Sequence, residues 1–232
     1  MTARIETSGT DGGIEISRII TSDANIIVPA SVAGVPVVSL GPQFLRDCHG
    51  SSSRTLIIPA SVIRASEEAL VSVSGLRAIN YLGDFETFNG FKWSLSTDCQ
   101  VTCGDGFTFL FLTGYPMCFP DFDDHILTSR QRLSEDLVMS RLSNPVYLTD
   151  DNRIRYEQYM RSRTFPMAEH AIVDNDVNAL RAVIDSGLLS VDDLKKLLEA
   201  SVRSGKTVST SVLMSTLNGM HRKELQGPDD LS

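Results

Sequence analysis

The chain has 232 residues, a hydrophobic content of 42% and a formal net charge of −8 at pH 7. This composition and a mean hydropathy of −0.01 are typical of a globular protein, long enough for one large domain or two small ones. The negative charge argues against nucleic acid and anionic membrane as partners, because a phosphate surface attracts a positively charged one.

The sequence contains neither a recognisable secretory signal nor an apolar segment long enough to span a membrane. The start, Met1–Glu6, lacks the charged and apolar regions of a secretory signal. The longest apolar run, Phe107–Leu112, is too short to cross a bilayer. We therefore expect a cytoplasmic protein without membrane insertion, and we expect the polar residues 1–11 to be frayed.

A short motif occurs twice, at Ile26–Val32 and at Leu56–Val62. Each copy has three apolar residues, a proline, two small residues and a valine. Apolar residues before proline predict a short strand that ends there, because proline fixes φ and has no N–H. A strand repeated about 30 residues apart is typical of a solenoid.

Further strands are predicted on either side of this motif. Gly13–Ile16 alternates between apolar and other residues, and Leu76–Ile79 forms a third apolar strand. If Gly34–Val38 is an insertion in the first copy, Leu40–Leu45 aligns with Ala65–Leu70. The sequence then predicts adjacent, parallel strands in register at Ile26–Val28, Leu56–Ile58 and Leu76–Ile79.

This pattern resembles the BspA-like class of bacterial leucine-rich repeats. The resemblance rests on Val28–Val32, Gly34–Gly41 and Ile58–Val62, and it covers residues 12–85. The second copy departs from the family, which has Ile-Gly and Phe where this chain has Ala-Ser and Leu70. The resemblance implies a short leucine-rich-repeat β-solenoid, an architecture whose extended surface suits protein binding.

Residues 86–125 are expected to cap this solenoid. Gly104–Gly106 predicts a turn between two strands. Phe107, Phe109 and Phe111 alternate with smaller residues and would share one strand face. An aromatic ladder of this kind can form a ligand groove, but it more often belongs to a core. Large apolar side chains throughout the segment favour the core: Trp93, Val101, Phe107, Phe109, Phe111 and Phe119.

Helices are predicted beyond the cap. Arg130–Leu142 carries an apolar stripe and ends at Asn144-Pro145. Thr149 is a good N-cap for a helix over Asp150–Arg163. A separate helix is expected at Met167–Val173, after Pro166.

The last helices repeat at an offset of 29 residues, with Ala171–Val173 matching Ala200–Val202. Gly187 and Gly205 are expected to end helices, and Ser190 to cap one. Residues 165–220 are similar to degenerate ankyrin-like repeats, although the Thr-Pro-Leu-His motif is missing and the repeat is shorter. The repeat predicts two stacked helical hairpins sharing one buried interface formed by Val173, Val183, Ile184, Val202, Val212 and Leu213.

The sequence thus predicts an α+β chain. A leucine-rich-repeat solenoid with its β-rich cap occupies residues 12–125, an ankyrin-like helical domain residues 126–220, and a flexible tail residues 221–232. The order of these segments also resembles that of certain bacterial leucine-rich-repeat proteins whose activity is unknown.

Candidate chemistry is sparse. The densest ligand cluster is Asp121, Asp123, Asp124 and His125, which can hold Mg²⁺, Mn²⁺ or Zn²⁺ in a metal-dependent hydrolase. Phe119-Pro120 precedes the cluster, whereas acidic catalytic pairs of the Asp-x-Asp type end a buried strand. The alternative is an acidic loop in which Asp123 or Asp124 serves a turn or cap.

The cysteines allow two interpretations. The chain has four scattered cysteines, which are expected to be reduced, partly buried thiols: Cys48, Cys99, Cys103 and Cys118. Three of them with His125 can also be drawn as a zinc set, although a Cys-x-x-Cys spacing is missing.

We therefore expect a non-catalytic module without a cofactor that binds another protein, with the hydrolase as the alternative. No nucleophile elbow, phosphate loop or dinucleotide fingerprint occurs in the sequence. The expected contact residues are Arg54, Thr55, Arg77 and Asn80, polar positions beside the repeat strands. Replacing Arg54 and Arg77 together is expected to weaken partner capture without changing stability.

Overall fold

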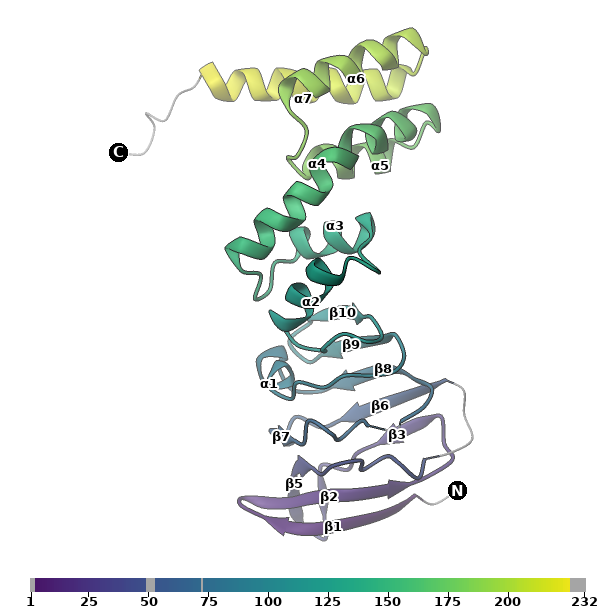
Figure 1. The fold of residues 1–232 in the computed structure, drawn as a ribbon, viewed down its shortest axis with the longest axis vertical. Helices are drawn as coiled ribbons and strands as arrows, with labels where there is room; N and C mark the ends of the chain where they lie inside the picture. The colour runs from purple at the N-terminus through teal and green to yellow at the C-terminus, as the bar shows by residue number, and fades with distance from the viewer. Residues whose placement is uncertain (1–2, 49–52, 72, 226–232) are drawn as a thin grey trace, which may run out of the picture. The chain divides into compact units, whose positions relative to one another are not determined.

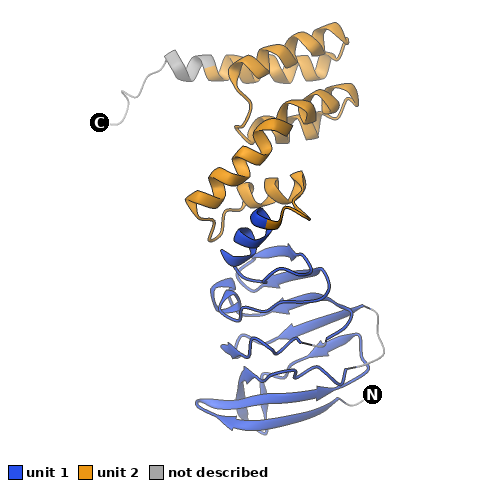
Figure 2. Cartoon of the chain, viewed as in Figure 1, with its two compact units in different colours: residues 1–128 blue, residues 129–232 orange. Residues whose placement is uncertain are grey.

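The computed structural model describes residues 3–48, 53–71 and 73–225 of a mixed α/β chain (Figure 1). The chain divides into two compact units, residues 1–128 and 129–232 (Figure 2). The first is built mainly from strands in a solenoid-like arrangement, and the second from helices.

The main sheet of unit 1 has five strands in the order β10-β9-β8-β6-β3. β3, β6, β8 and β9 are parallel to one another, and β10 closes the sheet antiparallel to β9. Their bounds are Asn25–Ile27, Arg54–Ile58, Leu76–Tyr81, Cys99–Cys103 and Thr108–Phe111 for β3, β6, β8, β9 and β10. The predicted parallel strands are therefore confirmed.

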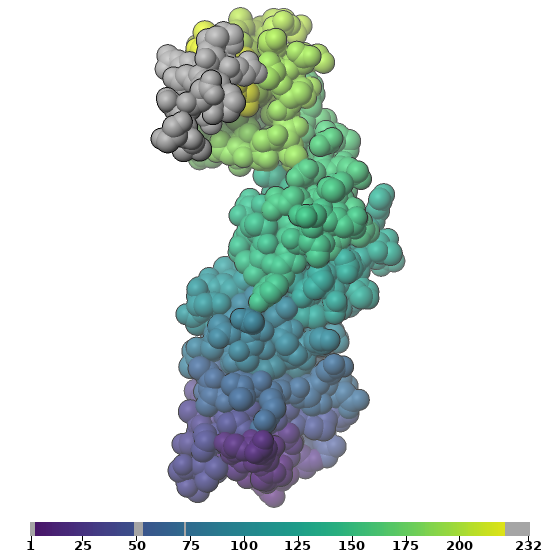
Figure 3. Space-filling view, turned by 90° about the vertical axis from the view of Figure 1, so that its left-hand side faces the viewer, coloured from purple at the N-terminus to yellow at the C-terminus, as the bar shows by residue number. Residues whose placement is uncertain are grey.

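The register of this sheet places apolar residues of neighbouring strands opposite one another in the core of unit 1. Ile26 pairs with Leu56, Leu56 with Ile79, and Ile79 with Val101, so that one ladder of apolar side chains crosses the parallel strands. Each of these side chains is at most 1% exposed. In the space-filling view the successive coils of unit 1 appear as bands from purple to teal (Figure 3). β9, which the sequence placed in the cap, is a fourth parallel strand.

A second sheet contains β1 (Arg4–Thr10), β2 (Gly13–Ile20), β5 (Val35–Leu40), β4 (Ser31–Val32) and β7 (Arg64–Ala65). The expectation that residues 1–11 are frayed was wrong for residues 4–10, because β1 pairs antiparallel with β2 along its whole length, and residues 1–2 lie outside the described chain. The strand is polar because it forms the sheet edge, so its apolar pattern is weak.

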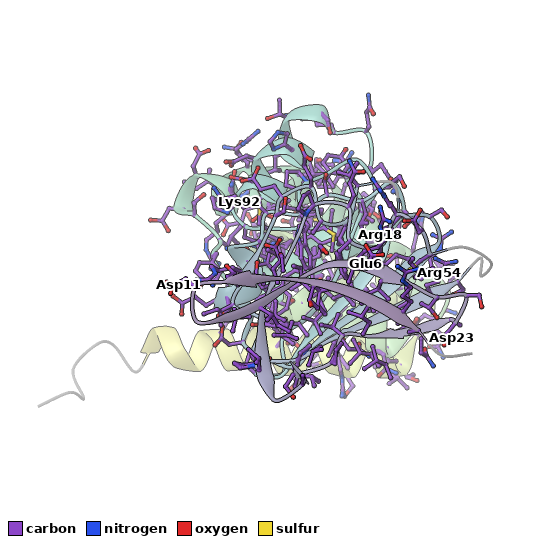
Figure 4. The ribbon with its side chains drawn as sticks, turned by 90° about the horizontal axis from the view of Figure 1, so that it is seen from below. Glu6, Asp11, Arg18, Asp23, Arg54 and Lys92 are labelled. Carbon is purple, nitrogen blue, oxygen red and sulfur yellow. The ribbon has the colours of Figure 1, made fainter. Side chains whose placement is uncertain are left out.

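Ion pairs join the edge strand to its neighbours. Arg18 lies 3.8 Å from Glu6 and 3.0 Å from Asp47, measured between nitrogen and carboxylate oxygen. Glu6 and Arg18 are labelled in Figure 4, which views unit 1 from the end at which β1 lies. All three side chains are partly exposed, so these pairs contribute little to stability.

The five-residue insertion in the first repeat forms a hairpin. β4 pairs antiparallel with β5, and the turn between them is Ala33-Gly34, both with positive φ. β5 then pairs parallel with β7, placing Leu40 opposite Ala65. The main-chain N–H of Gln43 donates to the Glu68 carbonyl at 2.9 Å. The alignment inferred from the sequence is therefore confirmed in space.

Aromatic side chains fill the end of unit 1. Phe85 and Phe88 lie on α1 (Phe85–Asn89), and the Phe85 ring stacks on Phe107 with centroids 3.6 Å apart. Phe122 lies on α2 (Asp121–Ser129) and packs edge-on against Phe109. The predicted core residues of this segment are buried, each at most 8% exposed, which confirms the prediction: Trp93, Val101, Phe107, Phe109, Phe111 and Phe119.

The first two helices of unit 2 differ from their predicted bounds. α3 (Glu135–Ser143) begins five residues later than expected, because Arg130 has a positive φ and Ser134 caps the helix. α4 (Asp150–Val173) is capped by Thr149 as predicted. It continues through Pro166, however, so the two predicted helices are one. Residues on both sides of the proline, such as Met160 and Ala168, are buried, so tertiary packing stabilises the helix on either side of it.

Two helical hairpins complete unit 2. α5 (Val177–Asp185) packs against α4, and α7 (Thr207–Leu225) packs against α6 (Val191–Arg203). α6 also contacts α4, and α7 contacts α5, so the hairpins stack as predicted. Gly187 and Gly205 adopt positive φ in the turns. α7 extends beyond the predicted start of the tail at residue 221, and residues 226–232 lie outside the described chain.

The predicted buried interface of the hairpins is only partly right. Leu213 and Val183 are 0% and 4% exposed, whereas Val173 and Val202 are 64% and 60% exposed. The turns before α5 and α7 repeat at an offset of 30 residues, one more than the sequence match. One residue corresponds to about 100° on a helix, which moves the matched side chains to different faces.

Candidate functional site

The outward face of the main sheet in unit 1 carries two ladders of side chains. The first crosses Asn25, Thr55, Ala78, Gln100 and Leu110, and the second crosses Ile27, Ile57, Asn80, Thr102 and Thr108. We call these ten residues the outer sheet face. Each position lies between inward residues of the core, because successive side chains of a strand point to opposite faces.

All ten side chains of the outer sheet face are uncharged, although the chain carries 50 acidic and basic residues, 29 and 21 respectively. Two of them are exposed apolar residues at opposite margins, Ile27 on β3 at 62% and Leu110 on β10 at 46%. Asn80 and Thr102, near the middle, are exposed and polar. The outer sheet face therefore combines polar and apolar side chains and contains no charged residue.

The polar side chains toward β10 are held by hydrogen bonds. The Gln100 amide donates to the Thr108 hydroxyl at 2.7 Å, and the Thr102 and Thr108 hydroxyls lie 3.4 Å apart. These side chains lose little further rotamer entropy on contact with a partner, because they are already ordered. The face thus presents ordered polar side chains on β9 and β10, with the apolar side chains of Ile27 and Ile57 on β3 and β6.

The predicted contact residues separate into two groups. Thr55 and Asn80 lie on the outer sheet face, and Arg77 is an exposed residue beside it. Arg77 has no partner on β6, because the register shifts so that Arg54 pairs with Leu76 and Thr55 with Ala78.

Arg54 is not a surface residue, which corrects the prediction. Its side chain is only 1% exposed, and its guanidinium Nη1 donates to the Cys48 carbonyl. It precedes Thr55 directly and therefore points to the inner face. Replacing Arg54 would test the stability of the fold rather than partner binding. Replacing Arg54 and Arg77 together is therefore not a test of the binding surface, and stability should not stay unchanged as the sequence predicted.

The acidic cluster forms the first turn of α2, not a loop. Asp123 is fully buried, while Asp124 and His125 are exposed. The His125 Nδ1 atom lies 2.8 Å from the Asp121 carbonyl oxygen. At about 100° per residue, Asp121 and Asp123 project to opposite sides of the helix. Within residues 3–48, 53–71 and 73–225, no group of three His, Cys, Asp or Glu side chains is placed to hold a metal ion.

All four cysteines are buried free thiols, as predicted. Burial raises the pKa of Cys99 to about 12, against the smaller opposing effect of the Arg77 charge. Burial also raises the pKa values of Cys103 and Cys118 to about 12, with further contributions from Asp105 and Asp121 respectively. These three thiols are protonated at neutral pH and are poor nucleophiles and metal ligands in that form.

Comparisons of the chain with protein-family models, curated proteins and solved structures found no match. The resemblance to BspA-like repeats stays a prediction. Among the helices that the structure describes, none combines the length and apolar character needed to cross a bilayer.

The sequence prediction missed the four residues of the outer sheet face that lie on β9 and β10. β9 and β10 contribute Gln100, Thr102, Thr108 and Leu110, which lie in the segment predicted as a cap. The signal was present, since Gln100 and Thr102 alternate with Cys99, Val101 and Cys103 as outward and inward positions of a strand.

Proposed function

We propose that this chain is a non-catalytic module that binds another protein through the outer sheet face of unit 1. The observation that carries the proposal is the pair of uncharged, in-register ladders across five strands. Charged residues are depleted at the centres of protein interfaces, where burial would remove their hydration. An uncharged face on a chain of net charge −8 fits that role.

We also propose the repeat class to which each unit belongs. The parallel coils and the aligned second repeat are consistent with a short leucine-rich-repeat solenoid of the BspA-like class. The stacked hairpins are consistent with a degenerate ankyrin-like pair. Four free cysteines favour a reducing compartment such as the cytoplasm.

The test introduces a charge at the middle of the face. Asn80→Arg combined with Thr102→Arg should reduce capture of a partner from the native cell by at least about tenfold, because an unpaired buried charge is strongly unfavourable. Glu86→Arg, an exposed position on α1, is the matched control and should capture normally. The Glu86 variant should keep the wild-type unfolding temperature, since Glu86 is exposed. The Asn80/Thr102 variant places two arginines directly opposite each other on neighbouring strands and removes the Thr102 hydroxyl, so it should unfold at a lower temperature, and circular dichroism must show that it is folded at the temperature of the capture experiment.

Two results contradict this proposal. The first is unchanged capture by the Asn80/Thr102 variant. The second is stoichiometric metal in the purified protein together with a hydrolytic activity that Asp124→Asn abolishes. That second result would support the alternative of a metal-dependent hydrolase using Asp121, Asp123, Asp124 and His125.

A further inference from the structure

One edge of the main sheet in unit 1 lies along β3. β3 is the last strand of this sheet, and β6 is its neighbour (Figure 1). The Ala24 carbonyl accepts a hydrogen bond from the Thr55 N–H of β6 at 2.9 Å. The Val28 N–H donates to the Ile57 carbonyl of β6 at 2.9 Å. These two bonds fix which main-chain groups of β3 face β6.

Four main-chain groups of β3 point away from β6. Successive residues of a strand direct their N–H and C=O groups to alternate sides, so the groups of Ile26 face β6 and those of Asn25 and Ile27 face outward from the sheet. Within residues 3–48, 53–71 and 73–225, none of these four outward groups has a main-chain partner. We call the N–H and C=O groups of Asn25 and Ile27 the β3 edge.

The β3 edge lacks a charged residue. Exposed sheet edges in natural proteins often carry charged side chains, because unpaired N–H and C=O groups pair readily with another strand. The edge strand of the second sheet follows this rule, since β1 carries Arg4 and Glu6. β3 has the sequence Asn-Ile-Ile. Ile27 is 62% exposed, more than any other large apolar side chain that the structure describes in unit 1. The edge therefore combines unpaired main-chain groups with an exposed apolar side chain, which suits the binding of an extended segment.

We propose that an extended segment of the partner protein adds to the β3 edge as a sixth strand of the main sheet. This inference rests on the proposed function, because it names how that partner binds. Alternating N–H and C=O groups at strand spacing are satisfied by another extended main chain, which presents the same alternation. The Ile27 side chain then lies beside a side chain of the added strand, so we expect an apolar residue at that position of the partner.

The length of the edge favours a partner protein over a second copy of this chain. Two β3 strands paired about a two-fold axis would share only a few hydrogen bonds over the three residues of β3. Such a contact is far smaller than the area that specific interfaces bury. In the partner complex the edge is continuous with the outer sheet face, since Asn25 and Ile27 belong to both. The outer sheet face then supplies the remaining contact area.

The first measurement uses the full chain by itself. Amide hydrogen exchange, read for each residue by NMR, should be fast at Asn25 and Ile27 and slower at Val28, whose N–H is bonded to Ile57. A photo-crosslinking amino acid at Asn25 should then attach a segment of another protein in the native cell, and mass spectrometry identifies that segment. A synthetic peptide with the sequence of this segment is the probe for the second measurement.

The second measurement adds this peptide to the full chain. Binding should slow the exchange of the Asn25 and Ile27 N–H groups at least about tenfold, because they become bonded to the peptide main chain. Ile27→Pro should bind the peptide at least about tenfold more weakly, because proline has no N–H, and the fold should be retained because a sheet edge tolerates proline. Ile27→Val keeps the N–H and should weaken binding less than about fourfold, which is the effect of one buried methylene.

A pair of modified peptides gives a test that does not depend on the folding of a variant. Two peptides are N-methylated at alternate residues, so that each lacks the N–H groups on one side of its strand. The peptide whose remaining N–H groups point away from β3 should lose binding, whereas the other should keep it. Equal binding of the two peptides would show that the segment does not pair as a strand.

Protected amides at Asn25 and Ile27 together with weak binding by Ile27→Pro support the proposal. A peptide that binds without slowing exchange overturns it, as does a cross-link to a second copy of this chain or to no protein. The proposed function is tested separately by the Asn80/Thr102 variant. If that variant loses capture while Ile27→Pro, shown to be folded by circular dichroism, keeps it, the outer sheet face remains the binding surface and only the β3 edge is wrong.

Discussion

At the scale of single residues, two arginines from one expected binding set have different roles. Arg54 is buried and contributes packing through its aliphatic stem as well as a hydrogen bond to Cys48. Arg77 is exposed on the neighbouring strand. Which of them points inward depends on the register shift between β6 and β8, which the sequence does not specify.

The first prediction compares these two arginines. Arg54→Ala should lower the free energy of unfolding by about 2 to 4 kcal/mol, because it leaves a cavity and an unpaired carbonyl. Arg77→Ala should change it by less than about 0.5 kcal/mol, as exposed substitutions usually do. Urea unfolding of both variants measures the difference, and equal values for the two would contradict the assigned burial.

The second prediction concerns the buried thiols. Since the folded-state pKa of Cys99 is raised from 9.0 to about 12, the folded state disfavours its thiolate, and Cys103 and Cys118 behave in the same way. Their contribution to stability is full below about pH 9 and is lost as the pH rises toward about 12. Thermal unfolding followed from pH 7 to pH 11 should therefore show a decline that begins above pH 9.

A chemical control accompanies this titration. At pH 8 a thiol of pKa about 12 is ionised to about one part in ten thousand, so a thiol-specific reagent should modify Cys99 very slowly in the folded protein. Addition of denaturant should release rapid modification. Fast labelling of Cys99 in the native state at pH 8 would show that the thiol is not buried.

At the scale of elements, the stacked hairpins provide a third prediction. Leu213→Ala should reduce the free energy of unfolding by about 2 to 5 kcal/mol, because Leu213 is 0% exposed in the core of unit 2. Val173→Ala is the matched control and should cost less than about 0.5 kcal/mol, because Val173 is 64% exposed. Denaturant unfolding checks both, and a small effect of Leu213→Ala would place that residue outside the core.

The elements predicted well from the sequence are those specified by local chemistry. The prolines after β3 and β6, the Thr149 and Ser190 caps and the Gly187 turn depend on neighbouring residues, and the structure contains each of them. Ser190 and Asp193 even form the reciprocal capping box, which lowers the pKa of Asp193 through the Ser190 side chain.

The predictions that were wrong concern elements that depend on tertiary contacts. Pro166 predicted a break in α4, but packing on both sides outweighs the lost hydrogen bond. The polar strand β1 exists because β2 supplies its hydrogen bonds, although Asp11-Gly12 is a hairpin turn signal that could have indicated it. Of the outer sheet face, the sequence predicted Thr55 and Asn80, whereas the four residues on β9 and β10 could be found only by knowing which strands are neighbours.

At the scale of the whole molecule, each unit has a core of its own. The fourth prediction is that residues 1–128 and residues 129–232, produced separately, each unfold cooperatively on heating. Residues 1–128 alone should also retain partner capture if the outer sheet face is the binding surface. Circular dichroism and the capture experiment test these two statements separately, and a fragment that does not unfold cooperatively would contradict the independence of the units.

The β4–β5 hairpin has a practical consequence for studying this protein in cells. Its five extra residues leave the pairing of Leu40 with Ala65 intact, so the coil accommodates a change of length there. The turn at Ala33-Gly34 is exposed, and the space around Gly34 is open. An epitope tag or a fluorophore attachment peptide inserted between these two residues would label the chain away from both ladders of the outer sheet face. Such an internal label keeps both chain ends unmodified.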